Sequence, residues 1–326
     1  MKSSAIAPSN IAFTKYWGRK DETLRLPENG SISMSLSNLL TTTTVEFSDQ
    51  YSKDEVIING GGLEPDEAER VIKHLDRVRK LAGIDQKAQI VSKNNFPSGT
   101  GLSSSASGFA ALTLAASKAA GLNLSEKELS ILARQGSGSA CRSIPSGFVQ
   151  WLDGNSSETS YAETIFPGDY WAIADVVAVV SEGKKEVATS VGQQSASSSP
   201  FMQVRLNHMA EKNKLCKKLI AEKNFTEFGE LVEAEALELH TIMLTQRPAL
   251  IYWTTGTLQI MKLVPHWRAE GLPVYFTINT GQDIHLICEA ENVEKVKEKL
   301  KELDFVKDFI VNTPGEGTRL TDKHLF

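Results

Sequence analysis

The sequence contains few cysteines, no surplus of positive charge and no long apolar run. The three cysteines lie far apart, at Cys141, Cys216 and Cys288, without the spacing of a metal site. The net charge of −5 and the lack of a basic block argue against a nucleic-acid partner. No apolar run approaches the roughly 18 residues of a membrane helix, and residues 1–20 lack the continuous apolar region of a secretion signal. We therefore expect a protein of the reducing cytoplasm with no membrane or nucleic-acid partner.

The sequence does contain enough apolar residues for a large core. With 41% hydrophobic and 23% charged residues over 326 positions, the chain is long enough for two domains. Strands and helices alternate in the first half, and long helices prevail after about residue 200. We predict a junction between residues 165 and 200, domains at 1–180 and 181–326, and a mobile loop at 193–200. The apolar spacing predicts helices at 64–83, 125–136, 203–222, 226–245 and 255–269.

The most informative segment is a Gly- and Ser-rich loop, 97-PSGTGLSSSASG-108, that leads directly into the apolar stretch 108–121. Small residues let backbone N–H groups approach a ligand, and the start of a helix favours negative charge. The segment is not a Walker A loop, because no Gly-Lys-Ser/Thr follows at the required spacing. It is not a dinucleotide fingerprint either, because Ser104 stands where the third glycine would be. A flexible linker is the alternative. The segment indicates a phosphate cradle with five hydroxyls, from Ser98, Thr100, Ser103, Ser104 and Ser105.

Three further segments carry candidate chemistry. Lys15 lies among apolar and aromatic residues and either snorkels to solvent or neutralises an anion. Arg142 follows small residues in 137-SGSACRS-143 and either clamps a carboxylate or pins a loop. The segment 277-TINTGQDIH-285 is a polar turn between two apolar strands, which alone could be a plain hairpin.

Together these segments resemble a known family. NIAFTKYWGRKD, PSGTGLSSSAS, SGSACRS and FTINTGQD occur in an order and at spacings similar to those of the mevalonate diphosphate decarboxylases of the GHMP kinase superfamily. The resemblance runs from about Asn10 to about Cys288. It implies an α+β GHMP kinase fold, with an N-terminal domain like ribosomal protein S5 domain 2 packed on a ferredoxin-like C-terminal domain. It also implies that ATP and Mg²⁺ phosphorylate the 3-hydroxyl of a 5-phosphorylated mevalonate, which then loses phosphate and carbon dioxide to give an isopentenyl product. The protein would serve isoprenoid biosynthesis.

The resemblance assigns roles to individual positions. Lys15, Arg142 and Asn279 would be the catalytic group, with Lys15 neutralising charge and Arg142 gripping the substrate carboxylate. Ser104 would contact Mg²⁺. The substrate would also contact Tyr16, Trp17, Ser137, Gly138, Ser139, Lys185 and Ser190. ATP would be bound by Ser92, Asn94, Pro97, Gly99, Gly101, Leu102, Ser103, Ser104, Ser105 and Ser107.

The chain departs from the family at the last motif. The family has an aspartate in a sequence like FxxDAGPN, but here Asn279 takes that place and is followed by Thr280, Gly281 and Gln282. A neutral amide orients a hydroxyl but accepts no proton from it, and Asp283 is a weak substitute because it lies four residues along. An engineered change would have left the flanking residues intact, so we interpret Asn279 as natural. We expect carbon dioxide in step with ADP, at a low rate. The alternatives are a mevalonate 3-kinase or other GHMP small-molecule kinase, and a ligand-binding descendant without catalysis.

The second departure concerns the substrate tail. No basic residue follows the pair Lys184–Lys185, and Ser190 and Gln194 stand in the candidate places. One cation fewer slightly favours mevalonate 5-phosphate over the 5-diphosphate. Arg70, Lys73 and His74 on the helix at 64–83 could supply the missing charge, but we expect each of them on its solvated face. We expect His240 to be a packed interior histidine. Homodimers are common in such a family, and the sequence leaves the oligomeric state open.

Overall fold

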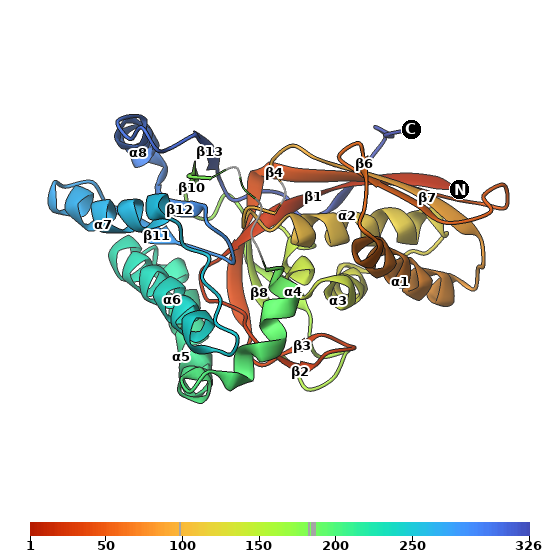
Figure 1. Ribbon diagram of the computed structural model, residues 1–326, viewed down its shortest axis with the longest axis horizontal. Helices are drawn as coiled ribbons and strands as arrows, with labels where there is room; N and C mark the ends of the chain where they lie inside the picture. Colours follow the sequence, from red (N-terminus) through yellow and green to blue (C-terminus); the bar gives the residue numbers. More distant parts are fainter. Residues whose placement is uncertain (98, 182, 184–186) are drawn as a thin grey trace.

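The computed structural model describes residues 1–97, 99–181, 183 and 187–326 (Figure 1). Two sheets organise these residues. The larger has eight strands in the order β14-β1-β4-β7-β5-β6, with β8 paired to β4 and β9 paired to β8. Its strands are β1 (Lys2–Ala12), β4 (Ser31–Ser48), β5 (Glu55–Ile58), β6 (Gly61–Gly62), β7 (Lys87–Asn94), β8 (Phe148–Trp151), β9 (Ala162–Phe166) and β14 (Arg319–Thr321).

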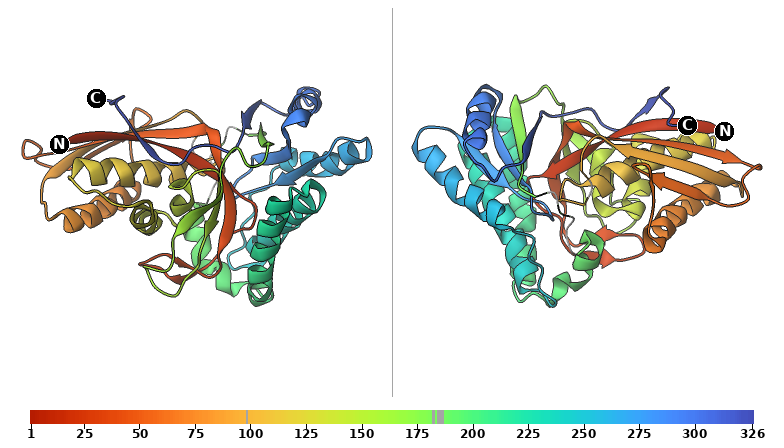
Figure 2. Two further views of the ribbon diagram at one scale, coloured as in Figure 1. Left: turned by 180° about the vertical axis from the view of Figure 1, so that it is seen from behind. Right: turned by 45° about the horizontal axis from the view of Figure 1, so that its top comes forward.

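Helices α1 (Pro65–Ala82), α2 (Ser104–Ala119) and α3 (Glu126–Gly136) cover one face of the larger sheet (Figures 1 and 2). Pro65 begins α1 in the first turn, and Gly83 ends it in the left-handed region, with φ 65°. Ser125 and Glu128 form the capping box that their spacing predicts at the start of α3. Helix α2 is apolar around most of its circumference because it lies between the sheet and the other two helices.

The smaller sheet has four antiparallel strands in the order β11-β12-β10-β13. Along β10, Ile173 and Val177 pack toward α6 and the larger sheet, whereas Ala174 and Val176 pack toward the opposite face, with residues of α7 and α8. Both faces of this sheet are therefore buried. The elements are β10 (Ile173–Val179), β11 (Val274–Thr277), β12 (Ile284–Glu289), β13 (Asp308–Asn312), α5 (Met202–Glu222), α6 (Phe225–Thr245), α7 (Thr255–Ala269) and α8 (Val293–Lys301).

The chain crosses from the larger sheet to the smaller one before β10, and it returns to the larger sheet at β14. Strand β10 precedes residue 180 but pairs within the smaller sheet, and β14 returns to pair with β1 beside the N-terminus. The division into 1–180 and 181–326 stays a prediction, and sheet membership groups β10 with the later residues. None of the described helices is both long and apolar enough to cross a membrane.

The remaining elements are short: β2 (Arg19–Asp21), β3 (Leu26–Pro27), α4 (Thr189–Gly192), and the 3-10 helices η1 (Gly138–Ser143), η2 (Gln193–Ser198) and η3 (Ala290–Asn292). The prediction of a mobile loop at 193–200 is wrong, because η2 occupies most of this segment. Ala196 is buried in a cluster with Trp17, and the Gln193 side-chain oxygen accepts a hydrogen bond from the Gly18 N–H at 3.1 Å. Polar composition alone suggested a loop, and these tertiary contacts order it.

Candidate active site

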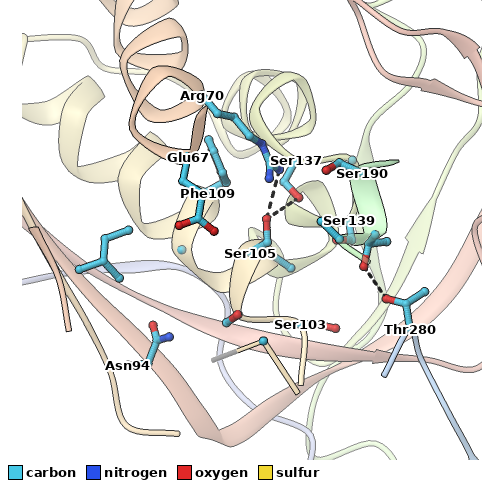
Figure 3. Close-up of a pocket in the computed structure, with 18 of the residues that line it drawn as sticks. Glu67, Arg70, Asn94, Ser103, Ser105, Phe109, Ser137, Ser139, Ser190 and Thr280 are labelled. Atoms are coloured by element: carbon cyan, nitrogen blue, oxygen red, sulfur yellow. Dashed lines mark hydrogen bonds between the residues drawn. The ribbon is translucent and has the colours of Figure 1, made fainter. Parts of the chain in front are cut away.

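A cavity of about 820 Å³ is lined by the ends of β1 and β7, the loop before α2, helices α1 and η1, and residues 279 and 280 (Figure 3). Its wall includes residues from both halves of the chain. The four segments singled out in the sequence, which lie up to about 270 positions apart, all contribute to it.

The loop before α2 lines this cavity with glycines and serines. Gly99 and Gly101 have φ of 82° and 114°, which favour glycine, and Ser103 is left-handed at 59°. Ser103 is the N-cap of α2, but within the described part of the chain no side chain caps the helix. The first N–H groups of α2 therefore remain to bind an anion at the positive end of the helix dipole.

The polar turn after β11 packs directly on this loop. A Cβ on Gly281 would lie 2.2 Å from the Cα of Gly101 and 2.2 Å from the Thr100 oxygen. The Gln282 N–H donates to the same Thr100 oxygen at 3.2 Å. Only glycine allows this approach, so Gly281 fixes the position of the neighbouring Asn279 relative to the loop.

Lys15 and Asn279 meet inside the cavity wall. The Lys15 ammonium nitrogen, Nζ, donates to the Ala12 carbonyl at 2.6 Å and to Asn279 Oδ1 at 3.3 Å. The Asn279 amide nitrogen donates to Ser103 Oγ at 3.1 Å. Burial lowers the pKa of Lys15 to about 7, and it outweighs the raising effect of the nearby Glu235 carboxylate. The structure thus joins the lysine, the replaced aspartate position and the phosphate loop.

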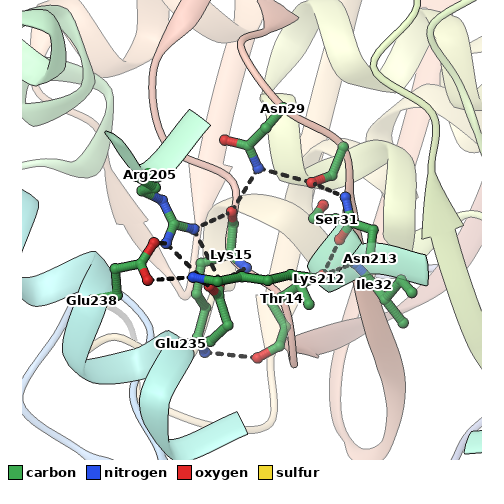
Figure 4. A network of polar contacts seen from close by, with 12 residues as sticks. Thr14, Lys15, Asn29, Ser31, Ile32, Arg205, Lys212, Asn213, Glu235 and Glu238 are labelled. Atoms are coloured by element: carbon green, nitrogen blue, oxygen red, sulfur yellow. Dashed lines mark hydrogen bonds and ion pairs between the residues drawn. The ribbon is translucent and has the colours of Figure 1, made fainter. Parts of the chain in front are cut away.

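A buried ionic network holds the backbone of Lys15 (Figure 4). Glu235 on α6 accepts from the Lys15 N–H at 3.0 Å, and Arg205 on α5 donates to the Lys15 carbonyl at 2.9 Å. Arg205 and Glu235 pair at 3.0 Å with almost no exposure, and Lys212 joins Glu235 at 2.9 Å. Lys15 lies after the end of β1, outside any helix or strand. These contacts from α5 and α6 therefore hold its backbone in position.

His240 and Asp283 lie around the same turn with different roles. His240 donates from Nε2 to the Asn279 carbonyl at 3.0 Å and stacks on Trp253 at 4.8 Å. Burial lowers the pKa of His240 to about 3, so the imidazole is neutral. Asp283 is buried away from the cavity wall and accepts from the Val180 N–H at 3.2 Å, and burial raises its pKa. His240 therefore holds Asn279, and Asp283 does not replace it.

Arg142 occupies a buried corner of the cavity beside Trp151. It donates to Ser31 Oγ at 2.7 Å and to Asn10 Oδ1 at 3.1 and 3.3 Å. These three bonds tie η1 to β1 and β4, and burial lowers the pKa of the guanidinium. Three of its five N–H groups are used in this way, which leaves two for a ligand carboxylate.

A second group of arginines lies near Ser137 and Tyr16. Arg70 on α1 donates to the Ser105 hydroxyl at 3.2 Å and to the Gly136 carbonyl at 3.0 Å. Burial, with repulsion from Arg25 and Arg19, lowers the pKa of Arg70 to about 9. All three arginines line the cavity. Such mutual repulsion indicates a site that an anion would stabilise.

Most residues predicted from the sequence line this cavity. Trp17, Leu102 and Ser107 do not line it. Trp17 is buried and donates a hydrogen bond to Gln246 at 3.1 Å, and Leu102 lies in the hydrophobic core. The Ser107 hydroxyl is hydrogen-bonded to that of Thr41. Ser98 and Lys185 lie outside the described residues. The lining positions are Lys15, Tyr16, Ser92, Asn94, Pro97, Gly99, Gly101, Ser103, Ser104, Ser105, Ser137, Gly138, Ser139, Arg142, Ser190 and Asn279.

Sequence reasoning placed Arg70 on a solvated face, and the structure corrects this. Arg70 precedes the buried Val71 and lies one turn before the buried His74, so it is at the inward edge of α1. That spacing was the available signal. Lys73 is on the solvated face as expected, paired with Glu69. His74 is buried and contacts Thr113, which corrects the expectation for it.

Comparisons with known proteins agree with this arrangement. Residues 7–162 match the family model for the diphosphomevalonate decarboxylase-like N-terminal domain, and residues 175–316 match that for the mevalonate 5-diphosphate decarboxylase C-terminal domain. The diphosphomevalonate decarboxylase of Candida albicans is 37% identical, over 98% of this chain and 91% of that protein. The phosphomevalonate decarboxylase of Haloferax volcanii is 33% identical, over 91% of each.

A solved structure of MDDEF in complex with MVAPP, AMPPCP and magnesium superposes with a TM-score of 0.94, at 39% identity and 99% coverage of both chains. The predicted α+β class and GHMP kinase fold are thereby confirmed. The chain belongs to the diphosphomevalonate decarboxylase family of ATP-dependent lyases.

Proposed function

We propose that this chain uses ATP to phosphorylate the 3-hydroxyl of 5-diphosphomevalonate and then releases phosphate and carbon dioxide to form isopentenyl diphosphate. Family membership supports the general reaction. The observation that carries the proposal for this chain is the arrangement of the cavity, with Arg142 in one corner, the group around Arg70 near Ser137, and Lys15 beside the phosphate loop. A substrate with two anionic ends and a central hydroxyl matches that spacing of charges.

The loop before α2 is the proposed site for the ATP phosphates. Its fit rests on the uncapped start of α2 and on the left-handed backbone of Gly99 and Gly101, which both line the cavity. The complex of MDDEF with AMPPCP, an ATP analogue, supports the use of ATP by this chain. Ser92 and Asn94, at the end of β7, would lie near the nucleoside.

Magnesium would be held mainly by phosphate oxygens, with Ser104 as the proposed protein ligand. The described residues contain no group of three or more His, Cys, Asp or Glu side chains that could hold the ion alone. When bound, the ion neutralises charge on the transferred phosphoryl group. The presence of magnesium in the MDDEF complex supports its use here.

The two ends of the substrate distinguish the candidate reactions. Arg142 would bind the C1 carboxylate through its two remaining N–H groups and release it as carbon dioxide. At the other end of the cavity lie Arg70, one of the residues that the sequence offered as a source of the missing charge, Arg25, and Arg19, which also pairs with Glu22. Two phosphate groups need more charge-assisted partners than one, so this placement favours the 5-diphosphate over the 5-phosphate. Ser190, which lines the cavity without charge, is the feature that keeps the 5-phosphate as second candidate.

The test measures ADP and carbon dioxide together, with ATP, Mg²⁺ and either substrate. We expect equal amounts of both products and a higher kcat/KM for the 5-diphosphate. ADP without carbon dioxide would instead show a mevalonate 3-kinase, and nucleotide binding without ADP a non-catalytic descendant. The variant Arg70→Met should reduce the preference for the 5-diphosphate. Lys73→Met on the exposed face of the same helix is its matched control.

A further inference from the structure

We propose that Lys15, as a neutral amine, accepts the proton of the substrate 3-hydroxyl in this chain and later returns it to the departing phosphate. The proposal rests on the proposed function, since it assumes phosphoryl transfer to that hydroxyl. It assigns to Lys15 a role different from the neutralisation of charge that its family resemblance implies. The reason is the neighbour at position 279, which is an amide and not a carboxylate.

The contacts of Lys15 Nζ suit a neutral amine. Two acceptors lie within hydrogen-bond distance, the Ala12 carbonyl at 2.6 Å and Asn279 Oδ1 at 3.3 Å. A neutral amine has two N–H groups, which these acceptors satisfy, and one lone pair in the remaining tetrahedral direction. Lys15 is 1% exposed, yet it lines the cavity. The lone pair is therefore kept from bulk water but lies at the wall that a substrate hydroxyl would contact.

Asn279 is arranged so that its amide cannot take the proton. Its Oδ1 accepts from Lys15, and its Nδ2 donates to Ser103 Oγ at 3.1 Å and faces the Asn10 carbonyl at 3.5 Å. An amide nitrogen in this place is a donor only. His240 donates its Nε2 proton to the Asn279 carbonyl and is neutral, so it adds no charge near Lys15. Asn279 therefore positions Lys15 and leaves it as the basic group at the turn.

The charges that face Lys15 come from four elements. Glu235 on α6 and Asp175 on β10 favour the ammonium form, whereas Arg142 on η1 and Arg205 on α5 oppose it. Glu235 is already paired with Arg205 and Lys212. Burial is the largest of all these influences, and it lowers the pKa of Lys15 to about 7. A substantial neutral fraction at physiological pH follows.

One amine is enough to balance the protons of the full reaction, because it takes up one proton in the first step and returns it in the second. In the first step, the 3-hydroxyl O–H bond breaks toward Lys15 Nζ, the oxygen forms a bond to the γ-phosphorus, and the bond to the bridging oxygen breaks to leave ADP. In the second step, the C3–O bond breaks, the C1–C2 electrons form the C2–C3 double bond, and carbon dioxide leaves. The phosphate departs with three negative charges and takes the proton from the Lys15 ammonium, which restores the neutral amine. No external oxidant, reductant or base is needed.

The experiment compares Lys15→Met and Lys15→Arg in two backgrounds, the natural chain and its Asn279→Asp variant. Methionine matches the length of lysine and accepts no proton, and arginine keeps the charge but does not deprotonate. We expect both substitutions to lower the rate of ADP formation by about 100-fold or more in the natural background, the scale of a lost general base. In the Asn279→Asp background, where a carboxylate can act, the loss with Lys15→Arg should be under about 10-fold. Lys218→Arg, on an exposed lysine of α5, is the matched control.

The rate of ADP formation should change with pH in opposite directions, depending on whether Lys15 is a base or only neutralises charge. If Lys15 is the base, single-turnover ADP formation rises as pH rises through its pKa, and this rise is absent in Asn279→Asp, where the added carboxylate keeps Lys15 charged. If Lys15 only neutralises charge, the rate falls over the same range, which overturns the proposal. Retained activity of Lys15→Arg in the natural background would overturn it as well. Because the readout is ADP, a chain that forms no carbon dioxide would refute the decarboxylase function without deciding the role of Lys15.

Discussion

Glu235→Gln and Glu238→Gln test how the ionic network beneath Lys15 works. The two carboxylates share partners, since each contacts Arg205 and Lys212. They differ in burial, because the Glu235 side chain is 0% exposed and that of Glu238 is 33% exposed. The pair therefore compares a buried and a partly exposed carboxylate that share two cationic partners, and Glu235 alone also accepts from the Lys15 N–H.

The expected losses of folding stability follow from the hydrogen-bond donors and charges that lose their partner in each variant. Glu235 accepts from four donors: the Lys15 N–H, two Arg205 nitrogens and Lys212 Nζ. A glutamine replaces one acceptor oxygen by an NH₂ group that faces these donors, and it leaves the buried Arg205 with only the partly exposed Glu238 as a carboxylate partner. Breaking such a buried pair costs about 3–5 kcal/mol. For Glu238 the expected loss is under about 1 kcal/mol, because solvent screens the pair.

Thermal unfolding and urea titration of the two variants measure this difference. With a shift of about 2–4 °C per kcal/mol, we expect Tm to fall by roughly 6–20 °C for Glu235→Gln and by at most a few degrees for Glu238→Gln. Activity should fall in the first variant at a temperature where it is still folded, because Lys15 loses its backbone acceptor. Equal losses in the two variants would refute the reasoning that burial sets the strength of this network.

Two further predictions concern the wall of the cavity, and a third concerns two buried histidines. Gly281→Ala should raise KM for ATP and lower kcat by about 10-fold or more, because its Cβ would clash with the backbone at 2.2 Å and force the phosphate loop apart. Gly62 also lines the cavity, but a Cβ there would meet nothing within 4 Å, so Gly62→Ala should change kcat less in the same assay. Arg70→Met should weaken binding of the 5-diphosphate by about 10-fold or more and that of the 5-phosphate less, as measured by calorimetry; an equal loss for both would argue against a tail site at Arg70. The pKa of His240 and that of His74 are both lowered to about 3 in the folded protein, below their unfolded value near 6.5. Stability should therefore be intact above pH 6.5 and fall as pH drops below it, since the unfolded chain then takes up protons that the folded chain refuses; His240→Phe should flatten part of this dependence in urea titrations at several pH values.

The sequence predicts the elements well where local chemistry decides them. Pro65 and Gly83 mark the ends of α1, and the capping box at Ser125 marks the start of α3. It fails where tertiary contacts decide, as in 193–200, where small polar residues suggest a loop but Ala196 is buried against the cluster around Trp17. Side-chain burial against a distant segment leaves no local pattern.

The candidate site shows the same limit. Motifs identify the residues that a ligand would contact through backbone and hydroxyl groups, such as Gly101 and Ser103, because those positions need small residues. Motifs do not show that Trp17 turns into the core or that Arg70 turns into the cavity. Both depend on how α1 and the segment after β1 pack in three dimensions. The hydrogen bond from His240 to the Asn279 carbonyl joins α6 to a turn 39 residues away, and no spacing rule predicts it.

The central claim is that this chain decarboxylates its substrate with Asn279 in the place of the family's aspartate. One measurement tests it most directly: the ratio of carbon dioxide to ADP formed by the natural chain from ATP, Mg²⁺ and 5-diphosphomevalonate. We predict a ratio of one throughout the time course. ADP formed without carbon dioxide, with a stable 3-phosphorylated product, would contradict the claim and make the chain a kinase.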